Sequence, residues 1–295
     1  MHTALQGRDP HGGAPDAPLF GKKSAAIATG GILGRIGPLE VRLAVDAAEV
    51  AAAQEVRYRV FYDELGAKQD ISTPFDLRDS DRFDAVCDHL LVFDTRLPGP
   101  AHRQIVGTYR LLRQEKAATA GGFYSSDEFE LEALAARHPH LSFLELGRSC
   151  VLPAYRTKRV IEVLWQGIWA YINHYDVGVM TGCASFHGTD PLAHAEALTY
   201  LAHNCRASGA WQVRAVAGRY HTMELMPIEA VSARAAIAAL PPLIKGYIRV
   251  GAKIGDGCVI DHAFGTTDVF IVMPVAELSE RHVNYYAGEA DRFAA

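Results

Sequence analysis

The sequence predicts a mixed α/β domain in which helices flank a mostly antiparallel central sheet. Residues 144 to 172 contain both kinds of element: a segment with β-compatible ends stops at Pro153, which cannot donate to a sheet ladder, and a basic turn leads into a helix. In that helix the apolar residues follow a helical period, at positions 160, 161, 164, 168, 171 and 172. Two further strand-like segments, 89 to 94 and 104 to 112, are separated by a Pro/Gly turn, which indicates an antiparallel hairpin.

Composition and charge narrow the class of protein. The chain has 295 residues, 49% of them hydrophobic, and a mean hydropathy of +0.01, so it can bury a large core. A net charge of −5 and a pI of about 6.2 argue against nucleic acid as a partner. The cysteines are odd in number and never spaced as CxxC, so we expect no disulfide framework, no metal and a reducing cytoplasm: Cys87, Cys150, Cys183, Cys205 and Cys258.

The first 38 residues are rich in Gly, Ala and Pro and predict a disordered tail. Their one semi-apolar run, residues 24 to 34, is too short and too broken by glycines for a signal peptide or a membrane span. A membrane-touching role for this tail, through Lys22, Lys23, Ile32 and Leu33, is the alternative. We expect a single domain from residue 39 to residue 295.

The first elements of that domain are a strand and a helix. Residues 40 to 45 alternate as a strand does, and Asp46 then caps a helix that ends at Gly66. A loop from residue 74 to residue 88 follows, and its five carboxylates repel one another unless a cation lies among them, which suggests an amine-bearing substrate. A solvated acidic loop is the alternative, and the EF-hand pattern of a calcium loop is missing. The acidic residues are Asp76, Asp79, Asp81, Asp84 and Asp88.

The remaining elements follow in order. In the hairpin strand 104 to 112, Arg110 lies among apolar residues and needs a nearby carboxylate. The expected elements after it are a short helix at 127 to 136, a strand at 177 to 186, a helix at 191 to 205, a strand at 211 to 217, a helix and a turn after Pro241, and a closing strand at 267 to 275. The part after about residue 230 is read either as part of the sheet or as a cap.

The basic turn before the central helix carries Arg156, Lys158 and Arg159, next to the free N–H groups of a helix N-terminus, and so predicts an anion site. Here the chain resembles the GNAT acyltransferases, whose sheet is splayed between its fourth and fifth strands. The glycines of the GNAT pyrophosphate turn are missing, which favours the single phosphate of a carrier-bound 4'-phosphopantetheine over coenzyme A. Three cations on a solvated turn are the alternative.

Two sets of motifs refine this resemblance. The first set resembles the acyl-homoserine lactone synthases: Arg57 with Phe61, residues 81–84, residues 107–112 and residues 145–148. Residues 241–247, 251–257 and 266–269 instead resemble the ornithine N-acyltransferases of ornithine-lipid synthesis, the hemolysin-like GNAT branch. The resemblance spans about residues 40 to 275. It implies transfer of a 3-hydroxyacyl chain from acyl carrier protein to the α-amine of L-ornithine, with no cofactor besides this donor.

The same resemblance suggests roles for individual residues. Glu145 is the candidate base for the attacking amine. Glu145 and Arg148 share a face of their strand only if it bulges near Gly147, because side chains alternate along a regular strand. We expect a network that orients Glu145 and grips the substrate carboxylate, from Arg110, Arg148 and Asp84. Substrate-binding residues would be Arg57, Phe61 and Asp81, and the pantetheine arm and carrier would meet Val151, Arg156, Lys158 and Arg159.

Other functions stay open on the sequence alone. One is an acyl-homoserine lactone synthase, and another is a non-catalytic protein that binds acyl carriers or lipid. A thioesterase with Cys150 as nucleophile and His187 as base is a third, although buried strand cysteines are mostly inert. The expected location is cytoplasmic, with peripheral contact at the inner membrane through the lipid product.

Overall fold

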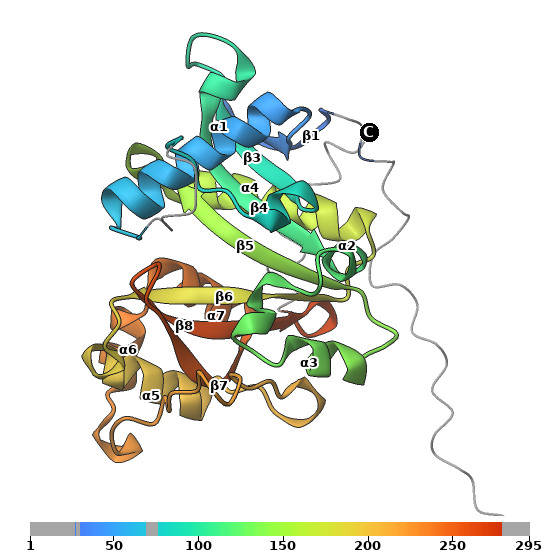
Figure 1. The fold of residues 1–295 in the computed structure, drawn as a ribbon. Helices are drawn as coiled ribbons and strands as arrows, with labels where there is room; N and C mark the ends of the chain where they lie inside the picture. The colour runs from blue at the N-terminus through green and yellow to red at the C-terminus, as the bar shows by residue number, and fades with distance from the viewer. Residues whose placement is uncertain (1–26, 28–29, 69–75, 279–295) are drawn as a thin grey trace, which may run out of the picture.

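A computed structural model of the chain describes residues 27, 30–68 and 76–278, and its centre is an eight-stranded sheet with helices on both faces (Figure 1). The strands lie in the order β1-β2-β3-β4-β5-β6-β8-β7. β5 and β6 run parallel, whereas the other neighbouring strands pair antiparallel. The strands are β1 Ile32–Ile36, β2 Leu39–Leu43, β3 Asp88–Asp94, β4 Ile105–Arg113, β5 Phe143–Val151, β6 Val179–His187, β7 Lys253–Asp261 and β8 Thr266–Pro274.

Different helices cover the two faces of the sheet. On one face the core includes residues of α4, α5 and α7, whereas α1 and α3 pack on the other face (Figure 1). The longest helix, α4, buries Trp169, Tyr171 and Ile172 completely or almost so. The helices are α1 Ala47–Tyr58, α2 Gln114–Thr119, α3 Leu131–Arg137, α4 Lys158–His174, α5 Ala195–Asn204, α6 Ala233–Ala239 and α7 Pro242–Val250.

Helix α1 begins and ends as its sequence predicts. The Asp46 side chain accepts a hydrogen bond from the backbone N–H of Glu49, which satisfies one free donor of the first turn. The chain then continues as a π-helix over Arg59–Glu64, and Gly66 with φ of +74° follows its end. The π-helical turn places Phe61 over the sheet beside the pocket described below.

The strands β5 and β6 diverge after a short parallel contact. Phe143, Leu144 and Glu145 pair with Val179, Met180 and Thr181, and beyond these three pairs the two strands have no ladder in common. Gly182 lies where they part: it has φ of +156°, and a Cβ there would lie 2.3 Å from the carbonyl oxygen of Leu146. Only glycine permits this close approach. The splay expected between the fourth and fifth predicted strands is therefore confirmed.

The bulge expected near Gly147 is also present. On β4 and β5, Thr108 pairs with Cys150 and Arg110 pairs with Gly147, so β5 carries one extra residue between these pairs. Within this bulge Arg148 has a left-handed backbone, with φ of +49°. The extra residue places Glu145 and Arg148 on the same pocket.

Three parts of the sequence prediction are wrong. Strand β1 falls inside the segment expected to be a disordered tail, which is therefore not disordered over Ile32–Ile36; residues 1–26 lie outside the described residues. Residues 211 to 217 form only isolated bridges, such as Phe129 to Ala215, rather than a strand. The turn expected after α7 is strand β7, so the C-terminal part belongs to the sheet and is no cap.

Among the described residues, no helix has the length and apolar character to cross a bilayer.

Candidate active site

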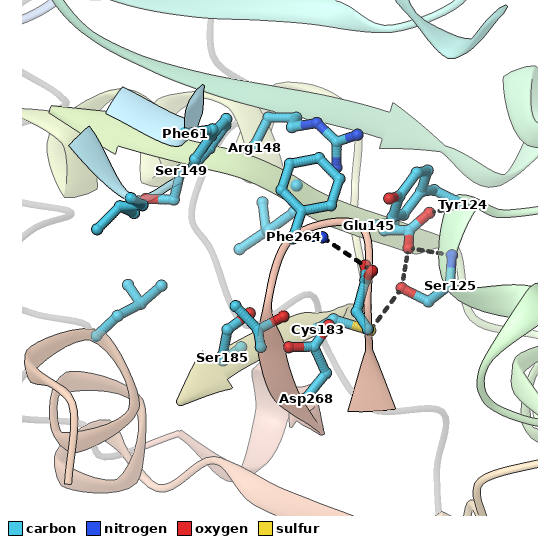
Figure 2. A pocket seen from close by; sticks show the side chains of 17 residues that line it. Phe61, Tyr124, Ser125, Glu145, Arg148, Ser149, Cys183, Ser185, Phe264 and Asp268 are labelled. Atoms are coloured by element: carbon cyan, nitrogen blue, oxygen red, sulfur yellow. Dashed lines mark hydrogen bonds between the residues drawn. The ribbon is translucent and has the colours of Figure 1, made fainter. Parts of the chain in front are cut away.

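A pocket of about 250 Å³ opens where β5 and β6 separate (Figure 2). Its walls come from the bulged part of β5, from residues 183–185 of β6, and from the β7–β8 turn with the start of β8. Apolar side chains from the π-helix and α7 complete it: Phe61, Leu65 and Leu243. The pocket thus combines charged groups on the strands with an apolar rim, as small-molecule sites usually do.

Glu145 is fixed in this pocket by the turn that precedes α3. Its Oε1 accepts hydrogen bonds from the backbone N–H of Ser125, at 2.8 Å, and from the Ser125 hydroxyl, and its Oε2 accepts one from the backbone N–H of Tyr124, at 2.7 Å. Figure 2 shows these contacts beside the Tyr124 ring. A carboxylate has about four acceptor positions, so one of them on Oε2 is left for a substrate or a water.

Burial governs the protonation of this carboxylate. Glu145 is 3% exposed, and burial raises its pKa above the ordinary value of 4.5, while the hydrogen bonds from Ser125 and Tyr124 act in the opposite direction. A buried carboxylate with a raised pKa is a better proton acceptor than an exposed one once it is ionised.

Arg148 lines the same pocket, and two aspartates hold its guanidinium in place. Its Nε donates to Asp79 Oδ2 at 3.0 Å and its Nη2 donates to Asp81 Oδ2 at 3.4 Å. The guanidinium lies over two aromatic rings, 4.7 Å from the centre of Tyr124 and 4.6 Å from that of Phe264. Its orientation in the pocket is therefore fixed.

The remaining charged residues form a network behind the pocket. Arg57 donates its Nε to Asp79 at 2.7 Å and binds both oxygens of Asp84, at 2.8 and 2.9 Å. Arg110 donates to Asp81 at 2.6 Å and to Asp84 at 3.3 Å, so the carboxylate partner that its sequence position requires is present. Burial acts to raise the pKa of Asp84, but the two arginines outweigh it and hold that pKa below 3.8.

This network corrects the interpretation of the acidic loop. The cations among its carboxylates are the protein's own Arg57, Arg110 and Arg148, so Asp79 and Asp84 are neither solvated nor free to hold a substrate amine, whereas Asp76 is exposed. Residues 69–75, which include the first two residues of this loop, lie outside the described residues.

A second group of carboxylates adjoins the pocket, and the sequence analysis missed it. Glu128, Asp261 and Asp268 each offer an oxygen, and these oxygens lie within 4.8 Å of one another. Cys183 connects this group to the first, because its Sγ lies 3.2 Å from the Ser125 hydroxyl and 3.3 Å from Glu128 Oε2. Burial first, and the Asp268 carboxylate second, raise the pKa of Glu128 to about 7. Such a set of oxygens suits an organic cation or a metal ion.

Comparisons with known proteins give the family. Residues 56–166 match the family model described as "Acetyltransferase (GNAT) domain". Three curated relatives are each named "L-ornithine N(alpha)-acyltransferase". The relative from Brucella abortus (strain 2308) is 56% identical over 93% of this chain and 96% of its own length. Those from Agrobacterium fabrum and Rhizobium meliloti are 55% and 54% identical, over 89% and 93% of this chain and the same shares of their own.

The chain belongs to the L-ornithine N(alpha)-acyltransferase family. The GNAT fold expected from the sequence is confirmed, with its mixed sheet and flanking helices. In this member of the family, three of the sequence-predicted site residues line the pocket, namely Glu145, Arg148 and Phe61.

Arg57, Asp84, Arg110 and Asp81 do not line it and serve as supports. Arg57 is 0% exposed and cannot contact a substrate, which contradicts its assignment as a substrate-binding residue. Tyr124 connects the network to Glu145. Arg110 lies 5.3 Å from the centre of the Tyr124 ring, and the backbone N–H of Tyr124 donates to Glu145.

The basic corner before α4 lies apart from this pocket. Arg156 binds both oxygens of Glu64, at 2.5 and 2.6 Å, and its Nε donates to the carbonyl of Val151 at 3.1 Å. Lys158 and Arg159 line another hollow, together with Tyr155 and Arg96. Lys158 is 90% exposed and 3.3 Å from Glu162. Arg156 is thus already paired, while Lys158 and Arg159 face solvent.

The thioesterase reading of Cys150 lacks support. Cys150 is buried, does not line the pocket, and its thiol lies 3.7 Å from the carbonyl of Val56. Burial raises its pKa to about 12, which leaves it protonated.

Proposed function

We propose that this protein transfers a 3-hydroxyacyl chain from acyl carrier protein to the α-amine of L-ornithine, which gives an N-acylated ornithine lipid precursor. The observation that carries this proposal is the 54 to 56% identity, over nearly the whole chain, to relatives named for acylation of L-ornithine. The pocket supports it, because a fixed carboxylate and a fixed guanidinium lie beside each other at the mouth of the splayed strands.

In this proposal Glu145 accepts the proton of the attacking amine. An α-amine has a pKa of about 8, so it is mostly protonated at neutral pH and must lose a proton before it attacks a thioester. The free acceptor position on Glu145 Oε2 takes that proton directly or through a water, while Tyr124 and Ser125 hold the carboxylate in place.

Arg148 binds the carboxylate of the acceptor amino acid. It lines the pocket; its Nε donates to Asp79, its Nη2 donates to Asp81, and its guanidinium also forms a hydrogen bond with the Tyr124 side chain. A guanidinium has five N–H donors in a planar fork that suits a carboxylate, so donors remain for the substrate. The bulge at Arg148 serves this purpose, since it directs the side chain into the pocket beside Glu145.

The acyl donor enters between β5 and β6. Beyond Glu145 the edge of β5 that faces β6 has no ladder partner, so its backbone groups can pair with the amide groups of a pantetheine arm. A backbone N–H there can also bind the oxyanion of the tetrahedral intermediate, an interaction often worth about 3 kcal/mol. The exposed Lys158 and Arg159 are then the cations for the pantetheine phosphate and the acidic carrier.

The proposal is tested with purified protein, L-ornithine, and 3-hydroxyacyl groups carried on acyl carrier protein or on coenzyme A. Mass spectrometry of the products should show N-acyl-ornithine from the carrier-bound donor. Turnover with the coenzyme A donor alone would overturn the donor assignment. A lactone product would favour the acyl-homoserine lactone synthase alternative, and no product with any donor would favour the non-catalytic one.

A variant tests the role of Glu145. In Glu145→Gln we expect kcat to fall by about 10²- to 10⁴-fold, because the amide cannot accept the amine proton. Glu40→Gln is a matched control on β2, where the carboxylate pairs with Arg35 rather than facing the pocket, and should keep full activity. Equal activity of Glu145→Gln and the control would remove the assigned base.

A further inference from the structure

The three carboxylates next to Cys183 carry more negative charge than the neighbouring basic side chain balances. Asp261 and Asp268 line the pocket, and Glu128 lies behind Cys183. Arg219, 3.1 Å from Glu128, is the basic side chain that forms an ion pair with this group among the described residues. Three carboxylates therefore face one guanidinium.

Asp268 has a buried carboxylate oxygen that no described donor satisfies. It is 6% exposed, and its Oδ1 is buried with no hydrogen-bond partner among the described residues. The hydroxyls of Ser185 and Thr266 interact with this carboxylate but carry no charge that would balance it. A buried carboxylate oxygen without a donor is costly, so a donor is expected to arrive with a ligand. Figure 2 shows Asp268 at one side of the pocket and Arg148 at the other.

We propose that Glu128, Asp261 and Asp268 bind the side-chain ammonium group of the acceptor amino acid, and thereby make the enzyme selective for a basic acceptor. This inference rests on the proposed function. Arg148 would hold the carboxylate of the acceptor at one side of the pocket, Glu145 would face its α-amine, and the three carboxylates would hold the far end of its side chain.

The geometry suits an ammonium group. An ammonium nitrogen has three N–H donors, and three acceptors placed about 2.8 Å from it along tetrahedral directions lie about 4.6 Å apart. The three carboxylate oxygens lie within 4.8 Å of one another. A divalent metal ion is less well served: Arg219 already adds positive charge beside Glu128, and Asp261 Oδ1 accepts hydrogen bonds from the backbone N–H groups of Ala263 and Phe264.

The test compares L-ornithine with L-norleucine, which replaces the side-chain ammonium by a methyl group of similar size. In wild type, kcat/KM for ornithine should exceed that for norleucine by at least about 10-fold, because a hydrogen bond to a charged group is worth about 1.5–3 kcal/mol. In Asp268→Asn the ornithine value should fall by about 10- to 100-fold, while the norleucine value changes less than about 3-fold. Asp127→Asn, an exposed carboxylate next to Glu128, is the matched control and should change neither value.

Each result decides a different claim. Wild type that acylates no ornithine refutes the proposed function itself. Wild type that uses both acceptors equally, or a variant in which both values fall together, refutes the ammonium site and leaves the proposed function intact. If Asp268→Asn does not fold, the wild-type ratio and Glu128→Gln decide the matter. Activity that EDTA abolishes and Mg²⁺ or Ca²⁺ restores would assign the carboxylates to a metal instead.

Discussion

Replacement of Arg57 by methionine should destabilise the folded protein strongly. Arg57 is 0% exposed and binds Asp79 at 2.7 Å and both oxygens of Asp84 at 2.8 and 2.9 Å. Three arginines and three aspartates make the network formally neutral, so loss of Arg57 leaves one negative charge buried. Removal of one partner from a buried ion pair costs about 3–5 kcal/mol. For a domain of this size that corresponds to a fall in Tm of about 6–20 °C.

Urea or thermal unfolding at pH 7 measures this loss. Arg35→Met is the control, because Arg35 also pairs with a carboxylate, Glu40, but its side chain is 47% exposed, and exposed pairs contribute at most about 1 kcal/mol. The double variant Arg57→Met with Asp84→Asn should recover at least about 1 kcal/mol relative to Arg57→Met alone, since it removes the excess charge. A free energy of unfolding for Arg57→Met within about 1 kcal/mol of wild type would refute the reasoning.

Two further predictions concern the pocket walls. Gly182→Ala should cost about 1–3 kcal/mol of stability and lower activity, because its Cβ would lie 2.3 Å from the Leu146 carbonyl oxygen; Gly246→Ala, with open space around it, should be neutral or stabilising by urea unfolding. Glu128 should make stability depend on pH, because its folded pKa of about 7 lies above the ordinary 4.5. Above pH 4.5 Glu128 loses its proton in the unfolded state but keeps it in the folded state. The free energy of unfolding should therefore fall by about 3 kcal/mol as the pH rises to about 7. This fall should be smaller in Glu128→Gln, where Asp268, with its pKa raised to about 6, still contributes, and the same slope in both proteins would contradict the assignment.

Part of the site could be predicted because individual residues required a particular partner or backbone geometry. A charge inside an apolar strand requires a counter-charge, and Arg110 has one in Asp81. Glu145 and Arg148 could share a face only through a bulge, and the bulge is present. These predictions used constraints that act over a few residues or on a single buried group.

The missed features depend on contacts between distant segments. Glu128 precedes α3, whereas Asp261 and Asp268 lie on the β7–β8 hairpin, and nothing in the sequence near Glu128 indicates that it meets them. Gly255 and Gly257 interrupt the strand pattern of β7; in the fold Gly257 has φ of +84° beside the Tyr220 ring. The sequence leaves the acidic loop open between a substrate amine and solvent because its cationic partners come from other segments, α1, β4 and β5.

The short join between β5 and β6 has a consequence for how this enzyme could change over evolutionary time. Only three residue pairs form the join, yet one hydrophobic cluster continues beneath it, from Leu144 and Ile168 to Met180 and Phe186. The width of the crevice therefore follows from the volume of interior side chains, because no ladder bonds hold its edges at a set separation. Natural variation at Leu144, Ile168, Met180 and Phe186 would adjust the width of the crevice, although none of these four residues lines the pocket.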